Sequence, residues 1–491
     1  MTPAVILACV GAYFALLLAI AWRTGRGADT AGYYLGNKAS PWYIVAFGMI
    51  SDTLSGVTFI SVPGSVGANQ FSYLQMVFGY VLGYVAIALV LLPLYYRLEL
   101  TSIYGYLGQR FGPRAQKTGA AFFLISRTLG AAARLYLAAG VFQTFVFDQW
   151  HVPFALTVAV MILLMLAYTY RGGIKTLVWT DTLQSAFLLL GVGLSLVALW
   201  RGLGLDWDGL VSTLQDSPHA QIFFWDWKDP KFFWKQFLSG AFIAVVMTGL
   251  DQNSMQKSLS CRTLGEAQKN IFWFSGVIVL VNFLFLALGA LLYAYAQSQG
   301  VAVPEKTDQF FPLLAFQHLG TFAAVVFVLG LTAATFSSAD SVLTTLTTSF
   351  CLDIAHDNRR SEAERTRLRH RAHIGFAVLL LLVILVFQAV SSRAVIDLVL
   401  KLATFTYGPL LGLFALGLFT RCPVNDRLAP LACVLAPVIC WVVERNAAAW
   451  FGGYKFGYEL LLVNGALTAA LLYGFTRLTG TASETEMAQR Q

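Results

Sequence analysis

Apolar segments of about twenty residues recur along the whole chain, and this repetition is the feature that most restricts its fold. A membrane-spanning helix needs ~20 apolar residues, whereas a barrel strand needs only ~10, so these longer runs exclude a transmembrane barrel. The sequence predicts an all-α polytopic membrane protein of about 13 transmembrane helices. We place them at residues 3–22, 41–64, 73–96, 118–147, 152–170, 176–200, 236–256, 270–297, 320–350, 374–390, 395–419, 428–444 and 458–476.

The composition excludes other classes of protein. Of the 491 residues, 57% are hydrophobic and 12% are charged, against about 25% charged residues in a soluble domain. A soluble multidomain enzyme, a disordered chain and a coiled coil are therefore excluded. Residues 1–22 lack the charged start and the cleavage site of a signal peptide, so we keep them as the first span.

The distribution of Lys and Arg predicts the orientation in the membrane. With the N-terminus outside, the cytoplasmic segments hold 22 of these residues, including Lys257, and the outer segments hold 8. Cytoplasmic loops carry an excess of Lys and Arg, so we predict the N-terminus outside and the C-terminus inside. The net charge of +8 follows from this bias, and we expect no nucleic-acid partner. Three further cations lie within spans: Arg127, Arg134 and Lys401.

Four further features of the sequence have simple interpretations. The six cysteines form no CxxC pair, so we expect free thiols. The Trp- and Phe-rich segment 201–235 is interpreted as lying on the membrane surface, or equally as a loop packed on the bundle. The run from Arg359 to His373 is interpreted as a solvated helical loop. The chain has no Asn-x-Ser/Thr site, which favours a bacterial plasma (inner) membrane protein.

Two polar stretches lie inside predicted spans, where polar residues are costly and usually functional. Gly48–Thr58 is mostly Gly, Ser, Thr and Asp, and a helix interrupted in this way can offer free carbonyls to a cation. In Ala333–Ser341, four residues at helical spacing share one face: Ala334, Ser337, Ser338 and Ser341. Neutral oxygens of this kind suit Na⁺. The alternatives are close helix packing through small residues, and hydroxyls bonded to their own helix.

Charged residues within other spans indicate a second cation and a ligand. Asp181 in the sixth predicted helix needs a cation, a proton or an arginine, and with Asp340 it can share a second cation. Thr248 and Asp251–Ser254 line a substrate path or form the cytoplasmic end of the seventh helix. Arg127 and Arg134 share a helix face. Three roles are open for these arginines. They bind an anion, they extend their charged ends to the membrane surface, or they pair with Asp52, Asp181 or Asp251.

Seven stretches resemble the sodium:solute symporter family and occur in the same order as in that family. They are YYLGNKASPW, SGVTFISVPG, LTSIYGYLGQRFG, RGGIKTLVWTDTLQ, DQNSMQKSLS, AATFSSADS and YGPLLGLFALGLF. The resemblance implies one transporter domain over residues 1–476 with a LeuT-like five-plus-five inverted repeat. Its parts are an extra helix at 3–22, repeats at 41–200 and 236–419, extra helices in 428–476 and a cytoplasmic tail at 477–491.

The resemblance also implies which residues bind ions and substrate. A common Na⁺ site uses the carbonyls of Ser51, Leu54 and Ala334 and the hydroxyls of Ser337 and Ser338. A second site matches Asp181, Ser337, Asp340 and Ser341, and because Asp340 replaces a family Ser, that site binds Na⁺ or a proton. Substrate candidates are Ser55, Thr58, Tyr73, Arg127, Arg134, Asp251 and Gln252, with Arg134 preferred. Val77 and Gly130 depart from the residues of the sugar and sialic acid carriers.

The predicted function is Na⁺-coupled symport, with one or two Na⁺ ions, of a small organic solute by alternating access. The solute is predicted to be an organic anion such as a carboxylate or an acidic sugar. The alternatives are a neutral sugar or polyol, and a non-transporting sensor. We expect no enzymatic activity, because the sequence shows no nucleophile–base pair, phosphate loop or metal cluster. The expected partners are the small molecule and the lipid bilayer, and a monomer should suffice for transport.

Overall fold

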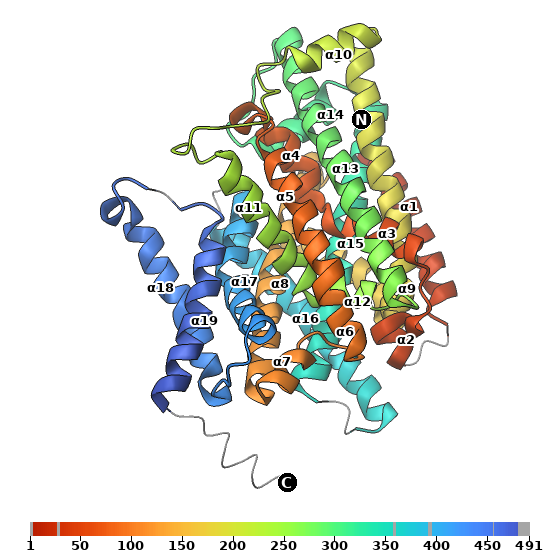
Figure 1. Ribbon diagram of the computed structural model, residues 1–491. Helices are drawn as coiled ribbons and strands as arrows, with labels where there is room; N and C mark the ends of the chain where they lie inside the picture. The colour runs from red at the N-terminus through yellow and green to blue at the C-terminus, as the bar shows by residue number, and fades with distance from the viewer. Residues whose placement is uncertain (1–2, 27–29, 357–359, 391–394, 455, 480–491) are drawn as a thin grey trace.

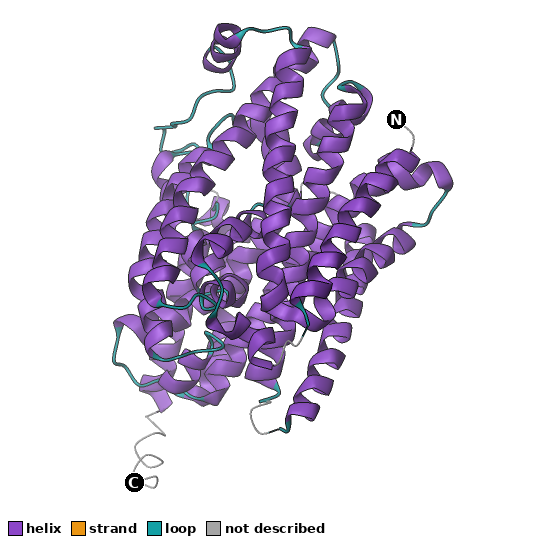
Figure 2. Ribbon diagram, turned by 90° about the vertical axis from the view of Figure 1, so that its right-hand side faces the viewer, coloured by secondary structure: helices purple, strands orange, loops and turns teal. Residues whose placement is uncertain are grey.

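The computed structural model describes residues 3–26, 30–356, 360–390, 395–454 and 456–479, and within these ranges it is helical with no strand. Residues 480–491 of the predicted tail lie outside the described residues. Figures 1 and 2 show helices running through most of the height of the molecule. The helices are α1 (Pro3–Thr24), α2 (Thr30–Leu35), α3 (Trp42–Thr53), α4 (Gly56–Asn69), α5 (Tyr73–Ala86), α6 (Leu92–Arg97), α7 (Gly105–Arg110), α8 (Pro113–Phe142), α9 (Phe154–Gly202), α10 (Trp207–Gln215), α11 (Phe233–Ala244), α12 (Gln252–Ser258), α13 (Leu264–Gln299), α14 (Phe310–Gln317), α15 (Gly320–Ser349), α16 (Glu362–Val390), α17 (Val395–Phe419), α18 (Ala429–Trp450) and α19 (Leu460–Thr479).

Ten helices within the described residues are long and apolar enough to cross a membrane, and two bent pairs raise that number to twelve. A shorter apolar helix, Phe154–Tyr170, lies where the fifth span is expected. It is separated from the rest of α9 by Gly173, whose positive φ of 52° breaks the helix. The helical membrane fold is confirmed, whereas the total of thirteen spans and the orientation stay predictions.

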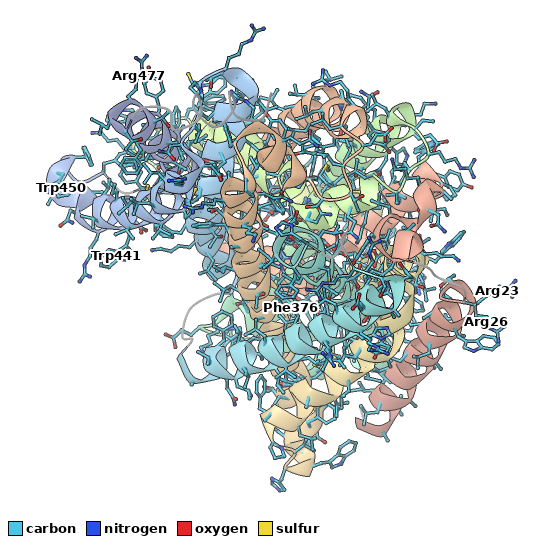
Figure 3. The ribbon with its side chains drawn as sticks, turned by 90° about the horizontal axis from the view of Figure 1, so that it is seen from below. Arg23, Arg26, Phe376, Trp441, Trp450 and Arg477 are labelled. Carbon is cyan, nitrogen blue, oxygen red and sulfur yellow. The ribbon has the colours of Figure 1, made fainter. Side chains whose placement is uncertain are left out.

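The outer helices carry the apolar surface that a membrane protein presents to lipid. Trp22 on α1, Val386 on α16 and Trp441 on α18 are each half or more exposed. Seen from below, Trp441 and Trp450 lie at the outer margin of the molecule (Figure 3). Arg23 and Arg26 lie at the opposite margin, near the end of α1 (Figure 3). Exposed apolar area of this extent is stable only against lipid or a partner.

Helix α15 forms the centre of the bundle and packs against α3, α4, α8 and α9. Every residue from Leu331 to Ser349 is buried, although many carry hydroxyls. Several of these hydroxyls donate to the carbonyl four residues earlier: Thr332, Thr345, Thr347 and Thr348. The expected alternative, hydroxyls bonded to their own helix, therefore holds for this group.

Two helices are broken near the middle of the bundle. Helices α3 and α4 meet at 57° across Leu54 and Ser55, and α11, extended to Gly249, meets α12 at 68°. Each break lies in the first helix of one predicted repeat. Gly56 allows the first break to touch α15, because a Cβ there would collide with the Thr335 hydroxyl.

Segment 201–235 is held on the bundle, since Gln75 bonds to the Phe224 amide and the Lys231 carbonyl, while Trp207, Trp225 and Trp227 stay about 65% exposed. No disulfide joins any of the six cysteines, all of which lie in the described residues.

The run ending at His373 is not a solvated loop throughout, and that interpretation was wrong. Arg369 and His373 are buried, because α16 begins at Glu362 and continues into its span, so its inner face packs on Tyr33 and Thr169. Arg359 lies outside the described residues.

Candidate functional site

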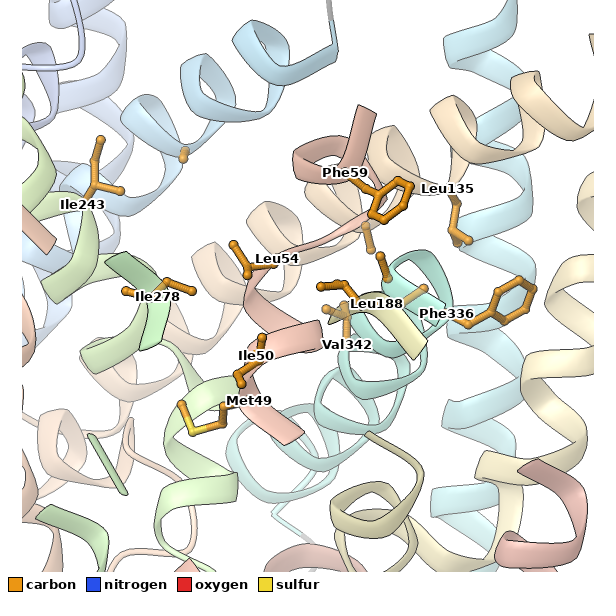
Figure 4. Packing of buried hydrophobic residues seen from close by; sticks show 14 of the residues in the cluster. Met49, Ile50, Leu54, Phe59, Leu135, Leu188, Ile243, Ile278, Phe336 and Val342 are labelled. Carbon is orange, nitrogen blue, oxygen red and sulfur yellow. The ribbon is translucent and has the colours of Figure 1, made fainter. Parts of the chain in front are cut away.

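The break between α3 and α4 leaves backbone oxygens without helical partners. Leu54 (φ −88°, ψ 78°) and Ser55 (ψ 174°) depart from helical geometry, and Figure 4 shows Leu54 on the connection between the two helices. In the described part of the chain, no hydrogen-bond donor reaches the carbonyl of Ser51 or Leu54. Buried carbonyls are normally paired, so these two are available to a cation.

Helix α15 supplies hydroxyls beside this break. The Ser337 hydroxyl lies 2.7 Å from the Ser51 hydroxyl and 3.1 Å from Asp181 Oδ1. Ser338 donates to the Thr335 carbonyl at 3.0 Å. The structure therefore brings Ser51 and Ser337 together, with Ala334 and Ser338 on the adjoining part of α15. A set of neutral oxygens fits a hard, singly charged cation such as Na⁺.

A lysine that the sequence analysis assigned to a loop lies within the bundle. Lys257 on α12 is 1% exposed, and its Nζ lies 2.6 Å from Asp181 Oδ2, 2.8 Å from Ser341 Oγ and 3.2 Å from Asp52 Oδ2. Asp52 also accepts from the Asn253 amide. Two of the residues predicted to hold a second cation are thus bound to an ammonium group of the chain itself.

Asp340 lies apart from this ammonium. Its Oδ2 accepts from the Tyr168 hydroxyl at 2.7 Å, and its Oδ1 has no hydrogen-bond partner among the described residues. The four residues predicted to form the second ion site, Asp181, Ser337, Asp340 and Ser341, therefore do not share one partner. Asp181 and Ser341 bind Lys257, whereas Asp340 binds Tyr168.

A cavity of about 110 Å³ opens directly beside the α3–α4 break. Its walls come from α3, α4, α5, α8, α11, α12 and α13. Polar lining residues are Asp52, Thr53, Ser55, Thr58, Tyr73, Tyr80, Tyr84, Arg127, Arg134, Thr248, Ser254 and Asn282, and apolar ones include Val57, Ile243, Met247 and Ile278. A second cavity of about 430 Å³ shares Tyr73 with the first, and the Tyr73 hydroxyl lies 3.2 Å from that of Tyr80.

The two arginines of α8 have different environments. The guanidinium of Arg127 binds Asp251, and Asp251 also accepts from Tyr407 at 2.6 Å. Arg134 is 8% exposed and lines the cavity, and among the described residues no carboxylate or other acceptor contacts it. An unpaired guanidinium in a buried cavity is the chemical signature of an anion site.

Comparison with known proteins decides the family. The profile described as "Sodium:solute symporter family" matches residues 33–427. The chain belongs to the sodium:solute symporter family.

Individual relatives agree with this assignment. The symporter is 26% identical to the sodium/sialic acid symporter of Aliivibrio fischeri, over 94% of this chain and 90% of that protein. It is 25% identical to the mouse sodium-coupled monocarboxylate transporter 1, over 89% and 70%. The solved structure of a Na⁺-coupled sialic acid symporter, in a substrate-bound outward-open state, matches with a TM-score of 0.82 at 19% identity, covering 97% and 98%. The predicted LeuT-like fold is confirmed by this likeness.

Family membership confirms the main functional predictions. The protein is a multi-pass membrane symporter coupled to Na⁺ that works by alternating access, and it is not an enzyme. The α3–α4 break and the Ser337 region are the part of the symporter whose donor set suits that ion.

The structure places the predicted substrate residues in two groups. Ser55, Thr58, Tyr73, Arg127 and Arg134 line the cavity. Two others have contacts within the protein instead: Asp251 caps α12 through the Asn253 amide, and Gln252 bonds to Ile103 and Thr101.

One of two lysines lies elsewhere than predicted. Lys401 lies within the span α17, as predicted, where it is about half exposed and pairs with Glu444 at 2.8 Å. Lys257 was assigned to a cytoplasmic loop, but the 68° bend turns α12 into the bundle. The excess of buried acids over buried arginines was the signal in the sequence that could have located a further cation.

Proposed function

We propose that this symporter imports a small organic anion across the plasma membrane, with the carboxylate bound by Arg134. Its Na⁺ would be held by the carbonyls of Ser51, Leu54 and Ala334 and the hydroxyls of Ser337 and Ser338. The observation that carries the proposal is the unpaired Arg134 guanidinium in the cavity. The bacterial sialic acid symporters among the relatives support the plasma membrane as its location.

The charges around the cavity favour an anion over a neutral solute. Arg127 pairs with one carboxylate, Asp251, and Lys257 contacts two, Asp181 and Asp52, so that cluster keeps one negative charge. Arg134 alone of these three cations lacks a carboxylate partner. Because burying an uncompensated charge costs several kcal/mol, a ligand carboxylate would stabilise the occupied cavity. The planar guanidinium also matches a carboxylate in a two-bond geometry.

The rest of the cavity restricts the size and shape of that ligand. A volume of about 110 Å³ resembles that of cavities that hold a molecule the size of benzene, ~150 Å³. Ser55 and Thr58 offer hydroxyls on one side, and the Asn282 amide oxygen has no partner among the described residues. Ile243, Met247 and Ile278 provide apolar walls. A short carboxylate with one or two hydroxyl or carbonyl groups fits this lining.

The α3–α4 break couples the ion to the substrate. Among the described residues the Leu54 carbonyl has no donor, and the next residue, Ser55, lines the cavity. A bound Na⁺ supplies positive charge that holds the break against α15. Ser55 and Thr58 would then be ordered for the ligand, so binding of ion and substrate would reinforce each other.

The names of the relatives agree with an acidic substrate. Sialic acid and monocarboxylates are the substrates named for the bacterial and mouse proteins. A neutral sugar or polyol remains an outcome of the test, as does a sensor that binds without transport.

The first experiment screens ligands by thermal unfolding of the purified protein in NaCl and in choline chloride. We expect short carboxylates to raise the unfolding temperature in NaCl, and their neutral alcohol or amide analogues to fail. The radiolabelled hit is then tested for uptake and counterflow in proteoliposomes. Stabilisation by a neutral sugar but by no acid contradicts an anionic substrate, and binding without counterflow indicates a sensor.

The second experiment tests Arg134 directly. Arg134→Gln should weaken binding of the carboxylate hit by about 10- to 100-fold, since a hydrogen bond to a charged group contributes ~1.5–3 kcal/mol. Stabilisation by Na⁺ alone should persist. Arg114→Gln, at the exposed start of the same helix, is the matched control. Unchanged ligand affinity in Arg134→Gln would rule out this residue as the anion ligand.

A further inference from the structure

We propose that Lys257 is a built-in cation that takes the place of a second Na⁺, so that this symporter binds one Na⁺ per chain. The proposal rests on the Na⁺ coupling of the proposed function and specifies its stoichiometry.

The ammonium group is fully coordinated where it lies. An ammonium has three N–H donors, and three oxygens surround this one: Asp181 Oδ2 at 2.6 Å, Ser341 Oγ at 2.8 Å and Asp52 Oδ2 at 3.2 Å. These oxygens belong to α9, α15 and α3. Lys257 therefore ties α12 to three other helices, a structural task that a bound ion at this position would also perform.

The local sequence directs the lysine into the bundle. Asp251 caps α12 by accepting from the Asn253 and Ser254 amides, and every residue of α12 is buried. Asn253 donates to both oxygens of Asp52 at 2.9 and 3.0 Å. This contact holds α12 against α3, so the flexible stem of Lys257 reaches between the two carboxylates.

A second Na⁺ does not fit the same residues. The Asp181 oxygen and the Ser341 hydroxyl that it would use already bind the ammonium. A further cation there would place two like charges in contact in a site that excludes water, which is strongly unfavourable. Asp340, the remaining acid of the predicted set, bonds to Tyr168 and does not contact the ammonium.

The position is also connected to both functional regions. Asp181 accepts from Ser337 of the common Na⁺ site through Oδ1 while it binds Lys257 through Oδ2. Asp52 binds Lys257 and lines the substrate cavity. Lys257 thus supplies a fixed positive charge between the proposed Na⁺ site and the substrate cavity. No second Na⁺ has to bind from solution to provide that charge.

The test counts ²²Na⁺ bound at saturation to the purified full chain, with Na⁺ as the only ligand. The wild type should bind one ion per chain. Lys257→Met frees the two carboxylates and should bind two, and Lys257→Met with Asp181→Asn should return to one. Lys269→Met, which removes an exposed lysine from α13, is the matched control and should bind one.

Each contrary result has a separate meaning. Two ions on the wild type would overturn the proposal and leave Na⁺ coupling intact, whereas no ion on the wild type would overturn the proposed function as well. A folded Lys257→Met that binds a single ion would also overturn the proposal. If Lys257→Met does not fold, the wild-type count decides, together with Lys257→Arg, which keeps the charge and should bind one ion.

Discussion

Two groups of oxygens adjoin α15 about one turn apart, and they differ in what surrounds them. The position near Ser337 and Ser338 consists mainly of hydroxyls and carbonyls, and among the described residues no protein donor reaches the Ser51 and Leu54 carbonyls. The position near Ser341 is built from carboxylates and already holds the Lys257 ammonium. Asp181 touches both positions, one oxygen to each.

This difference separates exchangeable charge from structural charge. Neutral oxygens bind a cation weakly enough to release it, and buried carbonyls are left without a partner when it leaves, which favours its return. Buried carboxylates hold a tethered ammonium permanently, because separating the pair would leave uncompensated charges. A symporter needs the first kind of site for coupling, whereas the second kind stabilises the helix arrangement in every step of the cycle.

The largest effect is expected when the tethered charge is removed. Lys257→Met should lower the free energy of unfolding in Na⁺-free buffer by about 3–5 kcal/mol, the usual cost of breaking a buried ion pair. Added Na⁺ should recover much of that loss. Thermal unfolding in choline chloride and in NaCl measures both effects, with Lys269→Met as the control. Equal stability of Lys257→Met and wild type without Na⁺ would show that the ammonium is not a structural charge.

The next largest difference is the response to membrane voltage. One Na⁺ entering with one monocarboxylate carries no net charge, so accumulation in proteoliposomes should not change with a K⁺ diffusion potential. A second Na⁺ would add one charge, worth ~2.3 kcal/mol per 100 mV, or about 50-fold in accumulation. A 50-fold response of the wild type to 100 mV would contradict the tethered-cation assignment.

The sequence alone identified the two polar stretches that meet beside Ser51 and Ser337, but it did not place Lys257 beside Asp181. Gly48–Thr58 and Ala333–Ser341 are polar stretches inside apolar spans, and the cost of burying them already indicates breaks and ion contacts. Lys257 was misplaced because charge counting assumes that a lysine at the end of an apolar segment lies in a loop. Its true place depends on a bend after Gly249 and on contacts to helices distant in sequence, which periodicity does not encode.

The arginines show the same limit of sequence analysis. Spacing placed Arg127 and Arg134 on one face, yet their different partners depend on where Asp251 lies after the bend in the α11–α12 pair. The sequence allowed Asp52 to pair with an arginine, whereas in the structure it pairs with Lys257.

A smaller effect is expected from removing one hydroxyl at the neutral position. Ser337→Ala, and separately Ser338→Ala, should raise the Na⁺ concentration for half-maximal stabilisation by about tenfold, or ~1.4 kcal/mol for one lost charged contact. Thr332→Val is the matched control, because its hydroxyl bonds only to the Val328 carbonyl on the same helix. Normal Na⁺ dependence in both serine variants would remove them from the ion site.

The smallest effect is expected at Asp340, although its sequence position matches the second ion site. Its Oδ2 accepts from Tyr168, an interaction that the amide oxygen of an Asn can also accept, and Lys257 is not among its hydrogen-bond partners. Asp340→Asn should therefore leave the number of bound Na⁺ ions unchanged and shift the half-saturating Na⁺ concentration by less than about twofold, or ~0.4 kcal/mol. Tyr168→Phe removes the hydrogen bond and keeps the Asp340 charge, and it should also leave the ²²Na⁺ count unchanged. Loss of a bound Na⁺ in Asp340→Asn but not in Tyr168→Phe would show that the Asp340 carboxylate binds Na⁺. The Lys257 ammonium would then not replace the second Na⁺ by itself.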